Sequence, residues 1–396
     1  MKADTPRHPA IVLASGGTGG HVFPADALAR ELVRRGISVY LFTDKRGAAF
    51  GAAPGAETGE IGVRTVPAAR LARNPLRLGH TLVQLGRGVC LARRALKEVD
   101  AAAVVGFGGY PSLPTLMAAR LLRLPIILHE QNAVLGRANR LMAPTARIIA
   151  TSFAAVKFLK PRADQKVVLT GNPVRAEIAD IGARTFHHPA PSGPVGLLVF
   201  GGSQGAAIFS RVVPEALARL DSSLRTRIKV VQQCREEDLE RVRTIYAAAG
   251  IEAETRTFFD DMPARLVAAH LVIARAGAST VAELAAAHRP AVLVPYPHAA
   301  DNHQRANAEA MAAAGAAVVI PEDAFDAERL GDHLADLLRG GATGLRKTAS
   351  AAGRIARPAA ARHLADLVLA VTPSLDAGED SEGTTRSTYI RQEAIR

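Results

Sequence analysis

Two glycine-rich turns carry the clearest potential for chemistry in this chain. Residues 15–21 read Ser-Gly-Gly-Thr-Gly-Gly-His, and residues 201–205 read Gly-Gly-Ser-Gln-Gly. Each turn directly follows an apolar, strand-like run and precedes a helical pattern. Glycine allows a sharp backbone turn, and the free N–H groups at the start of a helix bind anions such as phosphate. Two such turns predict two facing domains with a phosphate-bearing ligand between them.

His21 stands at the start of the helix that follows the first turn. The positive end of a helix dipole lowers the pKa of an imidazole there and favours a neutral ring that accepts a proton. A surface or capping histidine is the structural alternative, and the residue alone does not decide between them. Val22 stands where a dinucleotide-binding turn would place its third glycine, which disfavours a nicotinamide cofactor.

Two further polar clusters follow strand-like runs in the first half of the chain. Residues 106–112 read Gly-Phe-Gly-Gly-Tyr-Pro-Ser, and residues 129–132 read His-Glu-Gln-Asn. Ordinary turn chemistry explains any one of these clusters. In an open parallel sheet, however, ligands bind at the carboxyl ends of the strands, where all these residues are expected. Their joint placement favours a binding site.

A third glycine turn occurs in the second half, where residues 273–283 read as strand, turn and helix. Thr280 and Glu283 match the Thr-x-x-Glu pattern of a capping box, which is a complete structural explanation for both. In the functional alternative, Glu283 accepts hydrogen bonds from the two hydroxyls of a ribose while the turn amides hold a diphosphate. Spacing alone favours the cap.

The 396 residues are sufficient for two or three domains. Short apolar runs alternate with helical patterns, which predicts an α/β protein with two doubly wound parallel sheets. The expected strands are 10–14, 37–42, 61–66, 102–105, 125–129, 146–150 and 166–169, then 194–200, 228–232, 254–258, 270–274, 291–295 and 316–320. The expected units are a first domain at 1–172, a linker at 173–193, extended over 187–194, and a second domain at 194–343. A helical stretch at 344–371 either caps the second sheet or crosses back to the first domain, and 372–396 form a disordered tail.

The net charge of +12 is concentrated in residues 61–97, which contain seven Arg and Lys97 but no acidic residue. Leu78, Leu82, Leu85, Val89, Ala92 and Leu96 form one apolar helical stripe there. The simplest interpretation is a core-facing helix with a basic solvent face. Attraction to anionic lipid head groups, about 1 kcal/mol per cation, is compatible with it. Nucleic acid is disfavoured because stacking aromatics do not accompany these cations.

Little in the sequence supports a metal or a disulfide. Cys90 and Cys234 are the only cysteines and form no Cys-x-x-Cys pair, which fits a reducing cytoplasm. The first residues lack an apolar signal core, which argues against secretion. No Asp-x-Asp motif occurs, so we expect backbone amides and a helix dipole to stabilise a departing diphosphate.

Together with 171–175 (Gly-Asn-Pro-Val-Arg) and the stretch 260–304, these motifs closely resemble the MurG family, the bacterial glycosyltransferases that add N-acetylglucosamine to a lipid-linked muramyl-peptide. The match covers about residues 9–370. The resemblance implies a GT-B fold, in which two Rossmann-like domains face a cleft. It also implies one-step inverting transfer, with the donor bound mainly by the second domain and the acceptor by the first.

The resemblance assigns roles to individual positions. His21 is implied as the catalytic base. The implied donor contacts are Thr18, Gly19, Gly20, Asn132, Arg175, Ser203, Phe259, Ala278, Ser279, Thr280, Glu283 and Gln304. The implied acceptor contacts are Gly16, Gly17, Gly108, Gly109, Tyr110 and Arg140. Arg140 stands where some relatives carry Lys, and Ala276 where some carry Ser.

The implied partners are UDP-N-acetylglucosamine, undecaprenyl-diphosphate-linked muramyl-pentapeptide and an anionic membrane surface. Cell-wall and division proteins are further candidates, while no cofactor, obligatory metal or nucleic acid is expected. The implied location is peripheral, on the cytoplasmic face of the cell membrane. The rival functions are a related GT-B transferase with another acceptor, a UDP-sugar 2-epimerase, and a catalytically silent scaffold for cell-wall enzymes.

Overall fold

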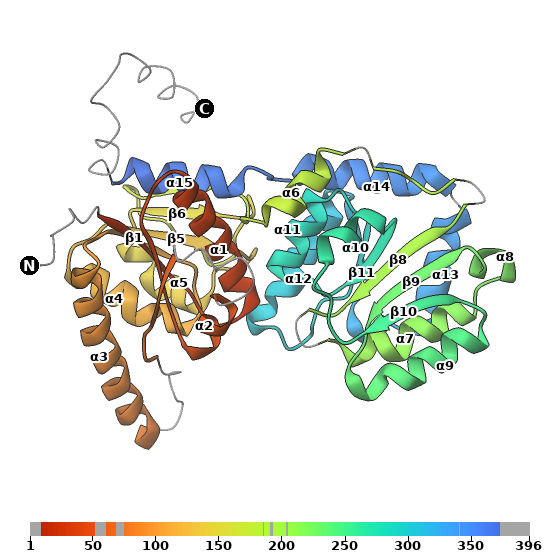
Figure 1. Ribbon diagram of the computed structural model, residues 1–396, viewed down its shortest axis with the longest axis horizontal. Helices are drawn as coiled ribbons and strands as arrows, with labels where there is room; N and C mark the ends of the chain where they lie inside the picture. The colour runs from red at the N-terminus through yellow and green to blue at the C-terminus, as the bar shows by residue number, and fades with distance from the viewer. Residues whose placement is uncertain are drawn as a thin grey trace, which may run out of the picture.

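The computed structural model describes residues 9–51, 61–68, 75–184, 186–190, 193–202, 205–339 and 341–372. Two parallel sheets lie side by side, each with helices on both faces (Figure 1). All the strands predicted from the sequence are present, and their ends differ from the prediction by at most two residues. The predicted α/β class with two doubly wound sheets is therefore confirmed. The predicted disordered tail lies outside the described residues, except for Thr372.

The first sheet has the strand order β3-β2-β1-β4-β5-β6-β7, with every neighbouring pair parallel. Its strands are β1 (Ala10–Ala14), β2 (Val39–Thr43), β3 (Ile61–Thr65), β4 (Ala101–Gly106), β5 (Ile126–Glu130), β6 (Ile148–Thr151) and β7 (Lys166–Leu169). Its helices are α1 (Gly19–Arg34), α2 (Lys45–Gly51), α3 (Pro75–Glu98), α4 (Leu113–Leu121) and α5 (Arg137–Met142). The central strand β1 is apolar throughout because both of its faces are buried.

The apolar stripe predicted on α3 is only partly a core contact. Val89, Ala92 and Leu96 pack into the core between α3, α4 and the first sheet, as predicted. For Leu82 the prediction is wrong, since this side chain is 53% exposed. The reason is geometric, because α3 extends well beyond the sheet that it covers (Figure 1). The helix at Leu82 therefore has no sheet to pack against, and the side chain of the predicted Leu78 lies outside the described residues.

The second sheet repeats the arrangement, with the order β10-β9-β8-β11-β12-β13 and parallel pairing throughout. Its strands are β8 (Val195–Phe200), β9 (Ile228–Gln233), β10 (Glu252–Arg256), β11 (Leu271–Ala274), β12 (Ala291–Leu293) and β13 (Ala317–Val319). Its helices are α7 (Ala207–Ala218), α8 (Ser222–Arg225), α9 (Leu239–Ala248), α10 (Met262–Ala268), α11 (Ala278–Ala286), α12 (His303–Ala313), α13 (Ala327–Arg339) and α14 (Gly341–Ile355). Helices α7, α9 and α13 pack on one face, while α10, α11, α12 and α14 pack on the other.

Two segments connect the domains. The segment predicted as a linker contains α6 (Ala176–Gly182), whose Ile178 and Ile181 are buried in the core of the second domain. After α14, the chain crosses back, and α15 (Ala360–Ala370) packs on α1 with Leu364 and Val368 buried in the core of the first domain. The sequence left two possibilities open for this stretch, and the structure shows both, because α14 packs on the second sheet and α15 crosses back to the first domain.

The strand orders locate the functional region. In each sheet, the chain adds strands on one side of the first strand and then on its other side. The change of side falls between β1 and β4 in the first sheet and between β8 and β11 in the second. The loops that follow such strands diverge and leave a crevice at the carboxyl ends, where ligands bind in this kind of sheet. The glycine turns at 15–20, 106–109, 201–205 and 275–277 all follow these four strands. Helices α1 and α11, which follow two of these turns, contact each other across the domain interface.

A buried histidine near the carboxyl end of β5 joins the first sheet to the connection between the domains by a hydrogen bond. His129 is fully buried, and its Nε2 lies 2.9 Å from the carbonyl oxygen of Gly171. Burial removes water from the ring and lowers the pKa of His129 to about 4. The ring is therefore neutral in the folded protein at any pH near 7.

The low pKa of His129 predicts a loss of stability in mild acid. The ordinary pKa of a histidine is 6.5, so the unfolded chain takes up this proton at a higher pH than the folded protein does. The stabilisation is complete above pH 6.5 and is lost as the pH falls towards 4. We expect the free energy of unfolding to fall by about 2 kcal/mol from this group between pH 8 and pH 5. Urea unfolding of the wild type and of His129→Leu at both pH values measures the effect, because the variant lacks the titrating ring. Equal pH dependence in the two proteins would contradict the assignment.

Candidate active site

The two glycine turns of the first domain contact each other. The N–H of Gly16 donates a hydrogen bond of 3.0 Å to the carbonyl of Gly108. A Cβ on Gly16 would lie only 3.1 Å from Cα of Gly109, so neither loop has room for a side chain. Gly108 and Gly109 also have positive φ angles of 82° and 74°, which other residues rarely adopt. Gly17 lies against Asp44 in the same region, so the four glycines predicted to bind the acceptor come together at the carboxyl ends of β1 and β4.

Tyr110, the next predicted acceptor contact, is hydrogen-bonded to Arg46, a residue that the sequence analysis did not identify. Nη2 of Arg46 lies 3.0 Å from the hydroxyl of Tyr110 and 3.4 Å from a carboxylate oxygen of Asp44. Arg46 therefore places a positive charge beside the glycine turns. Its position after the end of β2, at the same sheet edge, was the only signal in the sequence.

His21 lies between these turns and the residues that follow β5. Its Nδ1 is 3.2 Å from Oε1 of Gln131, and its Cδ2 faces Gly16 and Gly109. Burial lowers the pKa of His21 below the ordinary value, and the nearby Glu130 carboxylate and the Gln131 side chain offset part of this shift. The direction agrees with the prediction. The main cause is burial, whereas the prediction attributed the shift to the helix dipole.

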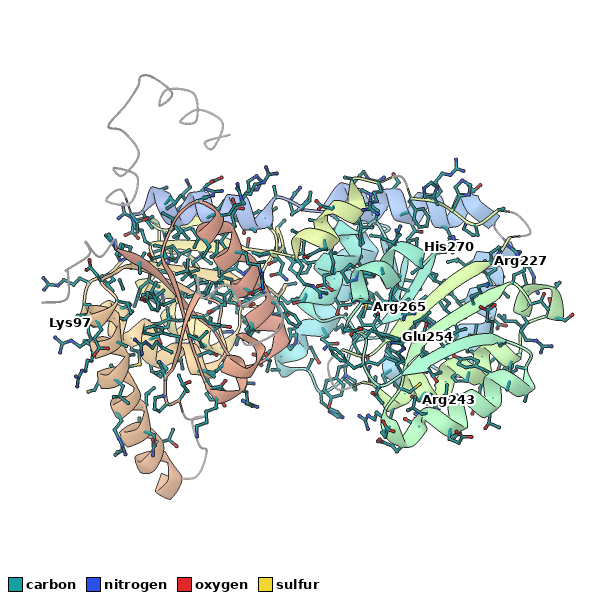
Figure 2. All side chains as sticks on the ribbon, in the orientation of Figure 1. Lys97, Arg227, Arg243, Glu254, Arg265 and His270 are labelled. Atoms are coloured by element: carbon teal, nitrogen blue, oxygen red, sulfur yellow. The ribbon has the colours of Figure 1, made fainter. Side chains whose placement is uncertain are left out.

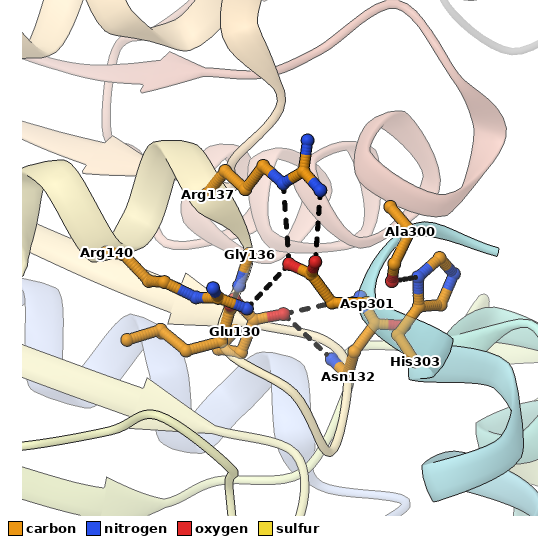
Figure 3. A network of polar contacts seen from close by, with 9 residues as sticks. Glu130, Asn132, Gly136, Arg137, Arg140, Ala300, Asp301 and His303 are labelled. Atoms are coloured by element: carbon orange, nitrogen blue, oxygen red, sulfur yellow. Dashed lines mark hydrogen bonds and ion pairs between the residues drawn. The ribbon is translucent and has the colours of Figure 1, made fainter.

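Glu130 organises the loop that carries Asn132. Its buried carboxylate accepts hydrogen bonds from the backbone N–H of Asn132 at 3.0 Å, the N–H of Gly136 at 2.8 Å and the side-chain amide of Asn139 at 2.9 Å. Figure 3 shows the carboxylate of Glu130 directed at Asn132 within this network. A buried carboxylate with several such donors fixes the loop rigidly, since each donor would otherwise lose its partner.

Asn132 also contacts the second domain. Its Oδ1 accepts a hydrogen bond of 3.0 Å from Nδ2 of Asn307, and the N–H of Ala133 donates to Oδ1 of Asn307 at 2.8 Å. Asn307 is fully buried on α12 and donates to the carbonyl of Ala276 as well. The predicted donor contact Asn132 is thus held by an interdomain residue that the sequence analysis missed. A polar residue within the apolar face of a helix was the available signal.

Arg140 lies in a second interdomain contact. Arg137 and Arg140, both on α5, point to the carboxylate of Asp301 in the second domain, at 3.0 and 2.7 Å (Figure 3). Hydrogen bonding to Arg137 and the charges of both arginines lower the pKa of Asp301. The guanidinium of Arg140 also lies 4.0 Å from the ring centroid of Phe158. Arg140 therefore faces the other domain in this structure.

The capping box predicted at Thr280 and Glu283 is wrong. Helix α11 begins at Ala278, with the extended Gly277 as its N-cap and no side-chain cap, so Thr280 is already the third helical residue. The carboxylate of Glu283 instead accepts a hydrogen bond of 3.2 Å from Nη2 of Arg175. Burial raises the pKa of Glu283, and Arg175 offsets part of this shift. The acid is therefore directed at the space between the domains.

Several of the remaining predicted donor contacts lie at the carboxyl ends of the second sheet. Oε1 of Gln304 accepts from the N–H of Ala276 at 3.2 Å and of Tyr296 at 3.0 Å, which joins the loops after β11 and β12. Ser279 has a buried hydroxyl without a hydrogen-bond partner. Ala278 is buried at the start of α11, and buried Phe259 lies beneath the guanidinium of Arg265. Thr18, Gly19 and Gly20 lie at the start of α1 in the first domain, with Thr18 and Gly20 exposed. Ser203 lies outside the described residues.

Two cavities differ in their relation to this site. One, of about 1130 Å³, lies between the domains, and Arg175 and Asp260 are among its lining residues. The other, of about 380 Å³, lies at the opposite, amino-terminal ends of β8, β9 and β10. Glu254, Arg265 and His270, labelled in Figure 2, line this second cavity. It is therefore separate from the glycine turns.

Among the residues that the structure describes, no group of three or more His, Cys, Asp or Glu side chains could hold a metal ion. No helix in the described part of the chain has the length and apolarity needed to cross a membrane. Cys90 is exposed, Cys234 is buried, and both are free.

Comparisons with known proteins identify relatives over nearly the whole chain. Residues 11–151 match the glycosyltransferase family 28 N-terminal domain, and residues 196–364 match the C-terminal domain of that family. The chain is 51% identical to the UDP-N-acetylglucosamine–N-acetylmuramyl-(pentapeptide) pyrophosphoryl-undecaprenol N-acetylglucosamine transferase of Rhodospirillum centenum, over 91% of this chain and 93% of that one. It is also 51% identical to the same transferase of Paramagnetospirillum magneticum, over 92% and 98%.

The comparison with solved structures leads to the same family. Acinetobacter baumannii MurG superposes with a TM-score of 0.73 and 31% identity, covering 91% of this chain and all of that one. A glycotransferase of kitacinnamycin shares the fold at 18% identity, with a TM-score of 0.63. The match covers 93% of this chain and 100% of that one. The architecture is GT-B, as the resemblance implied. The chain belongs to the MurG family of glycosyltransferases.

Proposed function

We infer that this protein transfers N-acetylglucosamine from UDP-N-acetylglucosamine to the C4 hydroxyl of undecaprenyl-diphosphate-linked N-acetylmuramyl-pentapeptide, with inversion. This is the lipid I to lipid II step of peptidoglycan synthesis. The observation that carries the inference is the 51% identity, across 91% of the chain, to a transferase named for this reaction. The site supports the inference because a neutral His21 lies beside the paired glycine turns of the first domain, near the second nucleotide-type domain.

The second domain has suitable groups for the donor. Glu283 accepts hydrogen bonds from the ribose hydroxyls, while the turn before α11 and the unpartnered hydroxyl of Ser279 hold the diphosphate. Arg175, which now pairs with Glu283, is released towards the phosphates when the ribose occupies that carboxylate. Donor binding thus exchanges one ion pair for another, and the buried charges keep partners throughout.

The first domain has suitable groups for the acceptor. The N–H groups at the glycine turns and the guanidinium of Arg46 neutralise the acceptor diphosphate. Nε2 of His21 accepts the proton of the C4 hydroxyl as that oxygen attacks the anomeric carbon from the face opposite UDP. The glycosidic electron pair leaves with UDP, and a β linkage forms. Backbone amides and the dipole at the start of α11 stabilise the leaving diphosphate, so the scheme needs neither a cofactor nor a metal.

Helix α3 is suited to bind the membrane that holds the acceptor. It exposes Leu82, Val83 and Leu91, at 53%, 63% and 51%, on a helix that projects from the first domain (Figure 1). The cations Arg87, Arg93, Arg94 and Lys97 are exposed on the same helix. Apolar side chains among cations favour an anionic lipid surface. The protein therefore acts as a peripheral protein on the cytoplasmic face of the membrane, where cell-wall and division proteins are candidate partners.

The decisive test measures UDP release from UDP-N-acetylglucosamine with and without lipid-linked muramyl-pentapeptide. We expect release to depend on the lipid acceptor and to yield the disaccharide-linked lipid. A putative UDP-N-acetylglucosamine 2-epimerase from Listeria monocytogenes shares the fold at 15% identity, with a TM-score of 0.63. An enzyme of that type would consume the donor without the lipid, and a scaffold would release no UDP at all. Either result would contradict the inference.

His21→Ala tests the proposed base. Loss of a positioned proton acceptor lowers turnover by about 10²- to 10⁴-fold, while donor affinity changes little. Steady-state kinetics and calorimetric titration with UDP-N-acetylglucosamine separate the two quantities. Unchanged turnover would remove His21 from this role.

Glu283→Ala tests the ribose contact. The loss of the two hydroxyl contacts should weaken binding of UDP-N-acetylglucosamine by about tenfold or more. Glu252→Ala is a control, since this acid also pairs with a cation, Lys229, but lies at the amino-terminal end of the second sheet. A normal dissociation constant for Glu283→Ala would exclude the contact.

A further inference from the structure

We propose that Gln131 is a positioning residue that fixes the tautomer and orientation of His21, so that Nε2 is the nitrogen that accepts the proton. The proposal deepens the proposed function and rests on His21 acting as the base. A chain of hydrogen bonds carries it, running from the carbonyl of Gly171 through His129 and Gln131 to His21. Each bond in this chain determines the next one.

The chain of hydrogen bonds begins at a carbonyl group, which can only accept a hydrogen bond. The carbonyl oxygen of Gly171 lies 2.9 Å from Nε2 of His129, so this nitrogen carries the hydrogen. The ring is neutral, because its pKa of about 4 leaves a single ring hydrogen near pH 7. Nδ1 of His129 consequently has a free lone pair and can only accept a hydrogen bond.

The lone pair of His129 determines which way the amide of Gln131 points. Nε2 of Gln131 lies 3.1 Å from Nδ1 of His129 and 3.1 Å from the carbonyl oxygen of His129. Both are acceptors, so both amide hydrogens are used. A flipped amide would place Oε1 against two acceptors inside a buried site, which is strongly unfavourable. Oε1 of Gln131 therefore faces His21.

The amide oxygen in turn determines the tautomer of His21. Oε1 of Gln131 accepts only, and it lies 3.2 Å from Nδ1 of His21, so Nδ1 carries the hydrogen. The lone pair is left on Nε2. The adjacent carbon, Cδ2, lies 3.1 Å from a Cβ position on Gly16 and 3.3 Å from one on Gly109. The free lone pair is therefore on the edge of the ring that borders the acceptor turns.

Other groups around the ring influence its charge. The carboxylate of Glu130 favours the protonated ring, as does a hydrogen bond to the backbone carbonyl of Phe107, whose effect is smaller than that of Gln131, whereas His303 disfavours it. Glu130 is engaged by donors from its own loop. Among the described residues, Gln131 is the side chain that hydrogen-bonds the imidazole of His21.

The first experiment compares Gln131→Leu with Gln165→Leu. Gln165 is a matched control because its amide also bonds two backbone carbonyls, those of Ala143 and Ala146, away from His21. We expect Gln131→Leu to lower kcat by about 10- to 100-fold with little change in KM for UDP-N-acetylglucosamine. Gln165→Leu should leave kcat close to that of the wild type. Equal kcat values for the two variants would overturn the proposal.

The pH dependence of kcat provides a readout that a structural role does not affect. In Gln131→Leu the ring of His21 loses the hydrogen bond to Oε1 of Gln131, which stabilises the imidazolium. The acid limb of the kcat profile should therefore move to lower pH. An unchanged acid limb in a folded Gln131→Leu protein would count against the contact.

The tautomer itself can be observed without turnover. Long-range ¹H–¹⁵N spectra of histidine-labelled protein, assigned with His21→Ala, should show His21 protonated on Nδ1 in the wild type and not in Gln131→Leu. A ring protonated on Nε2 in the wild type would refute the proposal.

A double-variant cycle separates this proposal from the proposed function. In a His21→Ala background, Gln131→Leu should have no further effect on kcat, because Gln131 acts through His21. If His21→Ala itself retains full turnover, the assignment of the base has failed. If His21→Ala is inactive while Gln131→Leu is fully active, only the positioning role has failed.

Discussion

The need to satisfy buried polar groups at the end of β5 is the constraint on which the site depends. Four consecutive polar residues, 129–132, lie there, and each bonds a different part of the molecule. His129 reaches the interdomain connection, Glu130 its own loop, Gln131 the start of α1, and Asn132 the second domain. Unpaired, these groups would each cost about 1–3 kcal/mol, so the surrounding loops adopt the positions that pair them. One strand end thereby brings together four distant parts of the chain.

The two domains contact each other through polar groups as well as packed side chains. Asn307 bridges the domains by neutral hydrogen bonds, and Asp301 does so through two arginines. The Asp301 pairs are partly exposed, so each contributes little in water. The buried Asn307 contributes specificity instead, because its amide fits only one arrangement of the neighbouring loops.

The strands and the glycine turns could be predicted from the sequence because each depends on local signals. Apolar runs bounded by Gly or Pro predicted all the strands, and the clusters that follow β1, β4 and β5 indicated the site. The capping box failed because the Thr-x-x-Glu pattern does not reveal that Gly277 starts the helix earlier. The roles of Gln131, Asn307 and Asp301 could not be predicted, since each depends on a partner more than 100 residues away in the sequence.

The double connection between the domains limits how they move. The chain passes from the first domain to the second before α6 and returns between α14 and α15. The two crossings touch, because a Cβ on Gly171 would meet Arg357 and Ala360. Two adjacent tethers allow rotation about the line through them and resist sliding or twisting. Displacement is smallest near such an axis, so a rotation of the domains about it would leave the peptide of Gly171 nearly in place, together with its hydrogen bond to the His129 ring.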